Sequence, residues 1–438
     1  MPKASRPNIV YVHTHDIGRY VQPYGYAVPT PNLQAFAEQG VLFRNAFCAN
    51  PTCSASRATL LTGMYPHSNG MTGLAHRGWS LNDYSQHIVH TLRDAGYTTA
   101  LAGVQHVTSH QKGEPWKVIG YDTWLGNQDA EQAAVAYLEE APDEPFFLAV
   151  GFSDTHREFG PVTDAGDPRY CRPPAPIPDT PETRLDMAQF MTSAKSIDDK
   201  MGVVFDALAR TGLDETTLVI CTTDHGIAFP AMKCNLTDHG TGIMLMVRGP
   251  GGFEGGRVID SLAGHIDLFP TVCDLLGIDP PAWLQGTSLM PLITGEAEDV
   301  KDAIFTEVNY HAAYEPMRAI RTKRWKYIRR FENRGHPILP NADDGLSKDV
   351  WLADGWAEMA PDNEMLFDLT FDPNEAHNLV GDPRYEGALA ELRARLDAWM
   401  VETDDPLLDG KVPAPAGSVV NDPDGISPRA RPRSTGAG

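Results

Sequence analysis

Five short apolar runs recur along this chain, and polar or glycine residues follow each of them at once. Apolar runs of this length, bounded by polar or turn residues, are typical of buried β-strands. Because sites in open α/β sheets form where the strands reach their carboxyl ends, we predict that the five polar segments share one edge of a sheet. The runs cover residues 8–12, 98–102, 146–152, 217–221 and 243–247.

Helical and strand-like patterns complete this organisation. Apolar residues between 190 and 208 recur every three or four positions and stop before Gly212, which predicts an amphipathic helix. Residues 318–321 and 325–328 alternate as strands do, and a second helix is expected over 385–400. We therefore predict an α/β domain that carries the catalytic residues, followed by a smaller α+β subdomain.

The predicted boundaries follow changes in composition. The α/β domain is expected over residues 1–303 and the C-terminal subdomain over 304–405. Residues 406–438 form a tail, which is rich in Pro, Gly and Ser from Val412 onward. Segments of this composition bury little apolar surface, so we expect a tail that is mobile or that wraps onto the domains.

Charge and cysteine content exclude several classes of protein. The 438 residues carry a formal net charge of −22, whereas nucleic-acid binding usually requires a basic surface. The six cysteines contain no Cys-x-x-Cys pair, which argues against a zinc ribbon or a disulfide scaffold. No apolar stretch reaches transmembrane length, and no signal peptide is recognised. We expect a bacterial-type cytoplasmic enzyme without nucleic-acid or membrane partners.

One motif places a cysteine four residues before an arginine. Cys53-Ser-Ala-Ser-Arg57 continues into an apolar, helix-like stretch that ends on Leu-Thr-Gly at residues 61–63. We predict that Ser54 or Ser56 caps a helix beginning near Arg57, so that Cys53 lies beside N–H groups that favour an anion. The alternative is a buried structural cysteine, and the spacing taken alone favours it.

Acidic and imidazole side chains follow four of the predicted strands. His15, Asp16, Asp224 and His225 are candidate ligands of a divalent metal, and His106 and His156 are candidate general acids or bases. Lys233 lies nine residues after Asp224 and is either an anion-binding group or a solvated surface lysine. Taken singly, each acid or histidine is better explained by a helix cap or a backbone hydrogen bond, whereas together on one sheet edge they indicate a site. A second Asp-His-Gly, at 238–240, follows no strand, and we interpret it as a loop outside the site.

Together these motifs resemble the sulfatase family of the alkaline phosphatase superfamily over nearly the whole chain, and within it the N-sulfatase branch most closely. The resemblance implies a large, mostly parallel mixed β-sheet flanked by helices, and a C-terminal subdomain with a four-stranded antiparallel sheet. The segments that carry it are 42–47, 53–63, 69–71, 152–157, 224–233, 316–318, 366–369, 372–375 and 377–379.

The resemblance also implies a mechanism for hydrolysing a sulfate ester or N-sulfate, here of a sulfated sugar. A maturation enzyme would oxidise Cys53 to formylglycine; one hydroxyl of the hydrate would attack sulfur, and the other would later lose a proton to expel sulfate. One divalent metal, usually calcium, would be held by Asp16, Asp224, residue 225 and the position-53 side chain. Arg57, Lys233, His106 and His156 would surround the sulfate, with His156 near the leaving group.

Four residues depart from the family pattern. His15 and His225 replace oxygen ligands by imidazole, which favours manganese or zinc over calcium. Val104 stands where the family has a lysine that helps to hold the sulfate, and Ala55 stands where many members have proline. These changes put the identity of the metal and the conversion of Cys53 in question.

Two other functions are therefore carried forward. His225 also occurs in the phosphonate monoester and phosphodiester hydrolase branch of the superfamily, and the loss of the lysine would also suit a binding protein that keeps the fold. Substrate specificity is expected from residues 154–178, from Asn309-Tyr310-His311 and from Arg318. The expected partners are a saccharide or small-molecule sulfate and a formylglycine-generating enzyme, and a homo-oligomer is left open.

Overall fold

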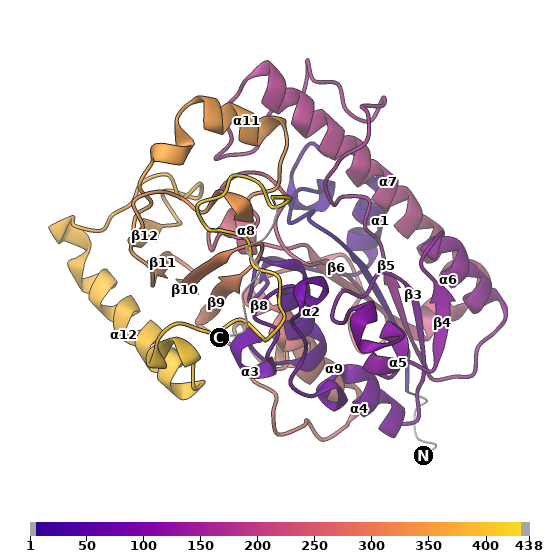
Figure 1. Ribbon diagram of the computed structural model, residues 1–438. Coiled ribbons are helices and arrows are strands. Elements are labelled where there is room, and N and C mark those ends of the chain that lie inside the picture. The colour runs from indigo at the N-terminus through magenta and orange to yellow at the C-terminus, as the bar shows by residue number, and fades with distance from the viewer. Residues whose placement is uncertain (1–5, 431–438) are drawn as a thin grey trace.

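A large sheet of eight strands and a smaller sheet of four organise the molecule (Figure 1). The computed structural model describes residues 6–430. The strands of the large sheet are β1 Asn8–Thr14, β2 Val41–Phe47, β3 Thr98–Gly103, β4 Thr123–Gly126, β5 Phe146–Gly151, β6 Thr217–Thr223, β7 Leu245–Arg248 and β8 Arg257–Gly264. Those of the small sheet are β9 Ala303–Tyr310, β10 Tyr314–Thr322, β11 Trp325–Arg330 and β12 Glu364–Asp368.

The large sheet is mixed and mostly parallel, in the order β4-β3-β5-β1-β6-β7-β2-β8. Strand β1 pairs in parallel with both β5 and β6, so the segments after these strands reach the same edge. Strand β7 is antiparallel to both of its neighbours. The prediction that all five strands end at one edge is therefore wrong for β7, because an apolar pattern predicts a strand without its direction. Residues 248–251 lie at the opposite edge.

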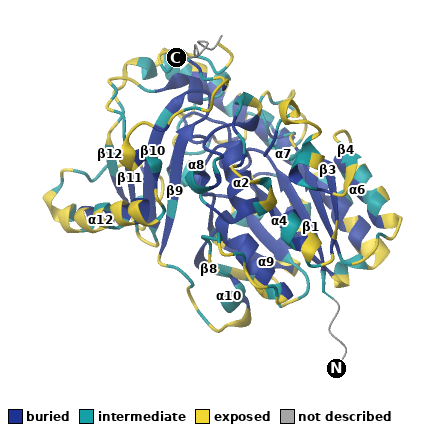
Figure 2. Ribbon diagram, turned by 60° about the horizontal axis from the view of Figure 1, so that its bottom comes forward, coloured by how far each residue is buried: buried dark blue, intermediate teal, exposed yellow. Residues whose placement is uncertain are grey.

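Helices cover both faces of the large sheet. Along β1, Val10 and Val12 pack with α1, α6 and α7 on one face, while Ile9 and Tyr11 belong to the core on the other face, with α2, α4, α5 and α9. Figure 2 shows the central strands and α2 buried, whereas α6 and α12 expose their outer sides. Helix α7 ends at Thr211 with Gly212 as its C-cap, as predicted from the 3–4 spacing.

The helices have the following bounds: α1 Pro31–Gln39, α2 Cys53–Thr62, α3 Pro66–Asn69, α4 Ile88–Asp94, α5 Pro115–Ile119, α6 Ala130–Glu139, α7 Pro181–Thr211, α8 Asp238–Thr241, α9 Leu268–Leu276, α10 Met290–Thr294, α11 Leu346–Ala353 and α12 Glu386–Glu402. In the described part of the chain, none of them combines the length and the apolar character that a membrane crossing requires.

Helix α2 begins at Cys53, four residues earlier than predicted. Its N-cap is Thr52, whose side chain makes no capping bond. The hydroxyls of Ser54 and Ser56 have other partners, since Ser54 accepts the Ala75 N–H at 3.0 Å and Ser56 donates to the Asp224 carbonyl at 2.5 Å. The expectation that either serine caps the helix is wrong, because both bond across the fold. Cys53 is nonetheless at the helix start.

The small sheet is antiparallel throughout, in the order β12-β11-β10-β9, and α12 packs against it. It confirms the four-stranded C-terminal sheet expected from the sequence. The chain then returns toward the large domain. Tyr310 donates to the Val412 carbonyl at 2.7 Å, and the Val419 N–H donates to the Arg77 carbonyl at 2.8 Å. Over its described residues the predicted tail thus wraps onto the fold, and residues 431–438 lie outside the described range.

Candidate active site

The ends of β1 and β6 meet the start of α2 at a cluster of buried polar side chains. Candidate ligand atoms of His15, Asp16, Cys53 and Asp224 all lie within 4.8 Å of one another. Asp16 has a positive φ of 43°, and its N–H donates to Asp224 Oδ1 at 2.8 Å. This turn after β1 directs the Asp16 carboxylate toward the residues that follow β6. The structure thus brings together candidates separated by up to 209 positions.

His225 joins this cluster through its Nε2 atom, which lies 3.3 Å from both Cys53 Sγ and Asp16 Oδ1. Its Nδ1 lies 2.9 Å from the Gly226 carbonyl, to which it donates in the matching tautomer. The imidazole therefore presents Nε2 to the cysteine and the carboxylate. Burial raises the pKa of the Cys53 thiol well above its usual value, further than Lys233 lowers it. A thiol held neutral in this way is a weak nucleophile.

The donor set fits a divalent cation. It contains the carboxylates of Asp16 and Asp224 and the imidazoles of His15 and His225. These are ligand types that Mn²⁺, Zn²⁺ and, through oxygen, Ca²⁺ accept. His15 Nδ1 lies 3.1 Å from Asp224 Oδ2, yet it makes no hydrogen bond of acceptable geometry to any described residue. Burial and the nearby Arg57 lower the pKa of His15 to about 4, so its ring is neutral at pH 7. A neutral, buried imidazole whose Nδ1 makes no well-formed hydrogen bond is suited to bind a metal.

Arg57 extends from the N-terminal half of α2 and contacts residues of the cluster. Its Nη2 donates to the Thr14 carbonyl at 2.9 Å and to Asp224 Oδ2 at 3.1 Å, and Nη1 contacts His13 Nδ1. Burial would raise the pKa of Asp224, but the charges of His225 and Arg57 outweigh it and hold that pKa well below its usual range. Arg57 is thus a fixed positive charge beside an ionised carboxylate.

Lys233 supplies a second positive charge from the segment after β6. Its Nζ donates at 2.9 Å to Asp16 Oδ2 and at 2.9 Å to Asp343 Oδ2. Burial lowers the pKa of Lys233, but the two carboxylates outweigh it and raise the pKa well above its usual value. The surface-lysine alternative is wrong, since the residue is 3% exposed.

Asp343 and His76 belong to this site, and the sequence did not indicate them. Asp343 comes from the segment before α11, and the charge of Lys233 holds its pKa well below its usual range despite burial. His76 Nδ1 lies 3.0 Å from His106 Nε2, and the two rings are stacked. Asp343 lies in a loop and His76 in the single-turn 3-10 helix Ala75–Arg77, and neither segment has a periodic sequence pattern that could have singled the residue out.

The two histidine candidates flank the cluster. The His15 ring centroid lies 5.6 Å from that of His106 and 5.5 Å from that of His156. His156 Nδ1 lies 2.6 Å from the Arg157 carbonyl, so donation there leaves Nε2 available. Burial lowers the pKa of His106 well below its usual value, which makes this ring neutral.

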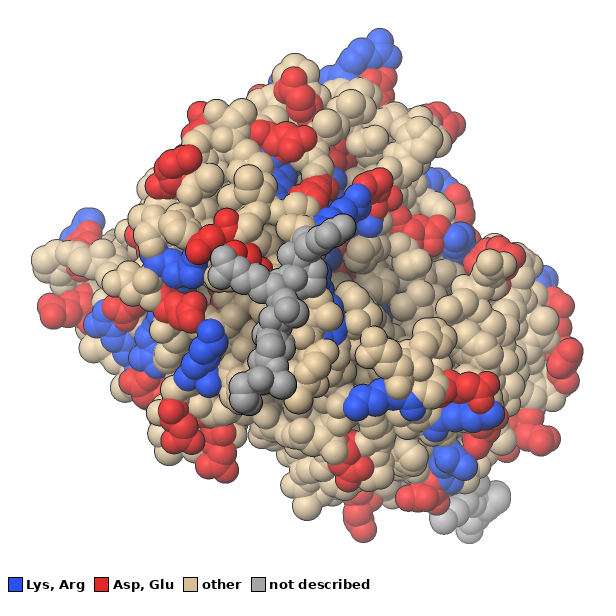
Figure 3. Space-filling view, viewed as in Figure 1, with Lys and Arg blue, Asp and Glu red and all other residues tan. Residues whose placement is uncertain are grey.

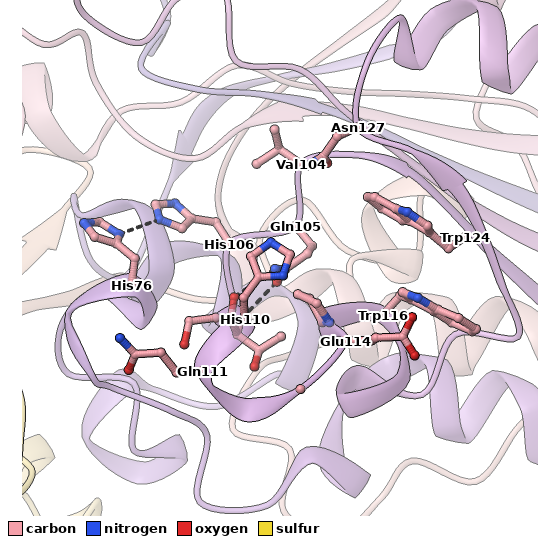
Figure 4. A pocket seen from close by; sticks show the side chains of 14 residues that line it. His76, Val104, Gln105, His106, His110, Gln111, Glu114, Trp116, Trp124 and Asn127 are labelled. Carbon is pink, nitrogen blue, oxygen red and sulfur yellow. Dashed lines mark hydrogen bonds between the residues drawn. The ribbon is translucent and has the colours of Figure 1, made fainter.

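His106 also lines a cavity of about 710 Å³, which Figure 4 shows from close by. Val104, which the sequence analysis singled out, forms part of its wall. Trp116 and Trp124 lie at one end of this cavity, and His76 and His106 lie at the other. The cavity therefore adjoins the polar cluster on the side of His106.

Two of the expected specificity segments have structural contacts instead. Arg318 is buried and donates two hydrogen bonds to the Asp405 carboxylate, at 2.5 and 2.9 Å, and a third to Asn309 Oδ1 at 3.2 Å. Tyr310 packs on Trp79 and anchors the tail. Tyr310 Oη and the Arg318 guanidinium are committed inside the subdomain, which argues against the predicted substrate roles of these two residues. Asn309 Nδ2 and His311 Nδ1, in contrast, are buried without a hydrogen bond to any described residue.

The second Asp-His-Gly sequence is a one-turn helix, α8, rather than a loop. The Asp238 carboxylate accepts from Lys326 at 2.7 Å and from Arg321 at 3.1 Å. Both cations belong to the small sheet, so α8 joins the two sheets. Asp238 thus pairs with cations of the small sheet, and the second Asp-His-Gly tripeptide lies outside the cluster of candidate ligands.

The mostly parallel α/β sheet carries buried polar residues at its carboxyl edge and a cysteine at the start of a helix, which suits an enzyme of the alkaline phosphatase fold. The sulfatase family model matches residues 7–278, and the model of the N-sulphoglucosamine sulphohydrolase C-terminal region matches residues 233–339. The chain therefore belongs to the sulfatase family, and it is a sulfate ester hydrolase.

Similar proteins support this placement. Human N-sulphoglucosamine sulphohydrolase is 30% identical over 443 residues, covering 87% of each chain, which confirms the likeness to the N-sulfatase branch. The structure of a 2-O GAG sulfatase superposes with a TM-score of 0.73 at 23% identity, covering 97% of this chain and 99% of that one. The phosphonate monoester hydrolase of Agrobacterium radiobacter superposes with a TM-score of 0.70 at 20% identity, covering 95% and 100%. The two superpositions show a shared fold.

Proposed function

We propose that this protein is a formylglycine-dependent, divalent-metal-dependent sulfatase that removes a sulfate ester or N-sulfate from a sulfated sugar. The observation that carries the proposal is the placement of Cys53. It starts α2, its Sγ lies 3.3 Å from His225 Nε2, and two carboxylates and two cations surround it. Because burial disfavours the thiolate, the unmodified cysteine suits this chemistry poorly. Oxidation to formylglycine would supply a hydrated aldehyde, whose hydroxyls can accept and then release a sulfuryl group.

The surrounding residues of this chain would bind the sulfate and move protons. Arg57 and Lys233 place fixed positive charge on two sides of Cys53, where sulfate oxygens gain negative charge during transfer. His156, with Nδ1 held by the Arg157 carbonyl, would deliver a proton from Nε2 to the leaving oxygen or nitrogen. The neutral His106 would accept a hydrogen bond on the same side.

His15, Asp16, Asp224 and His225 would hold the metal with the position-53 side chain. A bound divalent cation would lower the energy of the anionic oxygens at this point. The two imidazoles lead us to expect Mn²⁺ or Zn²⁺ rather than the calcium usual in the family.

A small saccharide suits this protein better than a long polysulfated chain. The human relative is named for N-sulphoglucosamine, and a structural neighbour is named a GAG sulfatase, which supports a sulfated sugar of the glycosaminoglycan type. The net charge of −22 would repel a polyanionic chain. Figure 3 shows Asp and Glu scattered among Lys and Arg over the face it presents. We therefore expect a monosaccharide or a chain end as the substrate.

Mass analysis of the peptide spanning residues 45–57 tests the nucleophile. Protein from its native host, or co-expressed with a maturation enzyme, should carry a hydrazide-reactive aldehyde at position 53. An unmodified thiol under both conditions would contradict the formylglycine mechanism.

Comparison of kcat/KM on aryl sulfate, aryl phosphonate and phosphodiester substrates tests the reaction. We expect the sulfate to be hydrolysed fastest. His225 carries the alternative, and a larger phosphonate or phosphodiester rate would replace the sulfatase proposal by the hydrolase of that branch.

A further inference from the structure

We propose that the cavity beside His106 is a saccharide subsite that takes an uncharged sugar ring while the cleaved sulfate lies at Cys53. The inference rests on the proposed function and specifies its substrate class. The cavity has a volume of about 710 Å³, and of its 14 lining residues all except His76 come from the segment 104–127. Small-molecule sites commonly have volumes of about 300–1,000 Å³, so a sugar ring fits.

The cavity is continuous with the reaction centre. A ring nitrogen of His106 lies within 4.8 Å of Cys53 Sγ and of a His15 ring nitrogen. His106 also forms the end of the cavity opposite the two tryptophans (Figure 4). A sulfate bound at Cys53 would therefore leave the rest of the substrate at the mouth of this cavity.

The lining has the chemistry that binds sugar rings. Indole rings offer broad apolar faces, and they bind ring faces at little cost in conformational entropy. Trp124 is 36% exposed, whereas Lys117 Nζ already lies 4.9 Å from the centre of the Trp116 ring. Trp124 is therefore the indole whose ring face is open for a sugar to stack on. Gln111 and Asn127, both exposed, bring amide groups that can hydrogen-bond sugar hydroxyls.

The charges of the lining select against a second anion. None of the 14 lining residues is Lys or Arg, and the Glu114 carboxylate is paired with Lys117. Val104 contributes an apolar side chain to this wall. An additional sulfate or a carboxylate on the bound ring would lose water without gaining a cation. We infer that the ring in this cavity carries no anionic group besides the one that is cleaved.

The experiment compares the wild type with Trp124→Ala, Trp124→Phe and the control Phe371→Ala, whose side chain is 82% exposed and outside the cavity. The substrates are D-glucosamine N-sulfate, D-glucosamine 6-sulfate, the 2-N,6-O-disulfate and 4-nitrophenyl sulfate. On the monosulfated sugar that is hydrolysed, Trp124→Ala should raise KM about tenfold with kcat within twofold, Trp124→Phe should restore most of the loss, and Phe371→Ala should change nothing. The disulfated sugar should show a KM at least tenfold above that of the monosulfated one.

Two results would overturn the subsite. One is an equal KM for wild type and Trp124→Ala on the sugar, and the other is tighter binding of the disulfated sugar. Hydrolysis of 4-nitrophenyl sulfate reports the proposed function separately. If no sulfate ester is hydrolysed, quenching of tryptophan fluorescence by N-acetyl-D-glucosamine, lost in Trp124→Ala, would keep the subsite while the sulfatase proposal falls; absence of quenching would remove both.

Discussion

Arg57 and Arg318 are both buried arginines paired with carboxylates, yet their surroundings differ. Arg57 lies among groups that still have unused hydrogen-bonding atoms, since His15 Nδ1 and the Nε of Arg57 itself make no hydrogen bond within the described chain. Arg318 is clamped by two bonds to Asp405 and further ones to backbone carbonyls and Asn309. Both clusters cost desolvation energy. The first adjoins a cysteine and a cavity, and the second adjoins a packed subdomain. We therefore propose that the first ionic cluster takes part in catalysis and that the second stabilises the subdomain.

Replacing Cys53 should give the largest difference in behaviour between the two clusters. Cys53→Ala should lower kcat/KM on aryl sulfate by about 10⁴-fold or more while leaving the unfolding midpoint nearly unchanged, because the nucleophile is lost and few packing contacts are. Cys273→Ala is the matched control, since both thiols are 1% exposed. Steady-state kinetics and urea denaturation of the two variants check this. Residual activity of Cys53→Ala above one-tenth would exclude position 53 as the nucleophile.

The next largest effect should come from Lys233. Lys233→Met should lower kcat/KM by about 10²–10³-fold, because a positive charge beside the transferring group is lost. The control is Lys326→Met, another buried lysine, which pairs with Asp238 away from the cluster and should lose stability but keep its rate per folded molecule. An equal loss of rate in both variants would mean that Lys233 acts through the fold.

Arg318 should show the opposite pattern. Arg318→Met leaves the Asp405 carboxylate buried without its guanidinium partner, which should lower the free energy of unfolding by about 3 kcal/mol or more. The value of kcat on aryl sulfate, corrected for the folded fraction, should stay within about twofold. Urea titration with activity measured in parallel checks both numbers, and a selective loss of kcat would restore Arg318 to the substrate site.

The smallest effect concerns His67, which contacts Glu307 beside Arg318. Burial lowers the pKa of His67, but Glu307 outweighs it and raises that pKa above its usual value. A raised pKa means that the stabilisation is complete below about pH 6.5 and is lost as pH rises through the pKa of the folded protein. His67→Gln should therefore destabilise the protein more at pH 6 than at pH 9, by about 1.4 kcal/mol for each unit of the shift.

Urea unfolding at both pH values measures this difference. The control is His377→Gln, because the side chain of His377 is 82% exposed. A difference that is equal at pH 6 and pH 9 would mean that His67 is not charged in the folded protein.

The sequence predicted best what depends on local pattern. The strands at β1, β3, β5 and β6 and the end of α7 followed from apolar spacing and a C-cap glycine. The direction of β7 did not, because pairing is decided by the neighbouring strands and not by the strand's own residues. The same limit applies to the site.

Strand ends marked Asp16, Asp224, His106 and His156, since topology alone gathers such residues at one edge. Asp343 joins them from the segment between β11 and α11, through a hydrogen bond to Lys233 that only the tertiary structure creates. Arg318 was assigned to the substrate because a motif shows that a residue matters without showing what it contacts.

The burial of Cys53 bears on when its proposed conversion can take place. In the folded chain the side chain is 1% exposed and lies under carboxylates and imidazoles that come from residues 15 to 225. An enzyme that oxidised Cys53 would have to reach its side chain, which in the folded chain is buried in the first turn of a helix. We therefore expect the proposed modification to precede folding, so that in cells the yield of active enzyme would depend on the rate of the modification relative to the rate at which the sheet closes around α2.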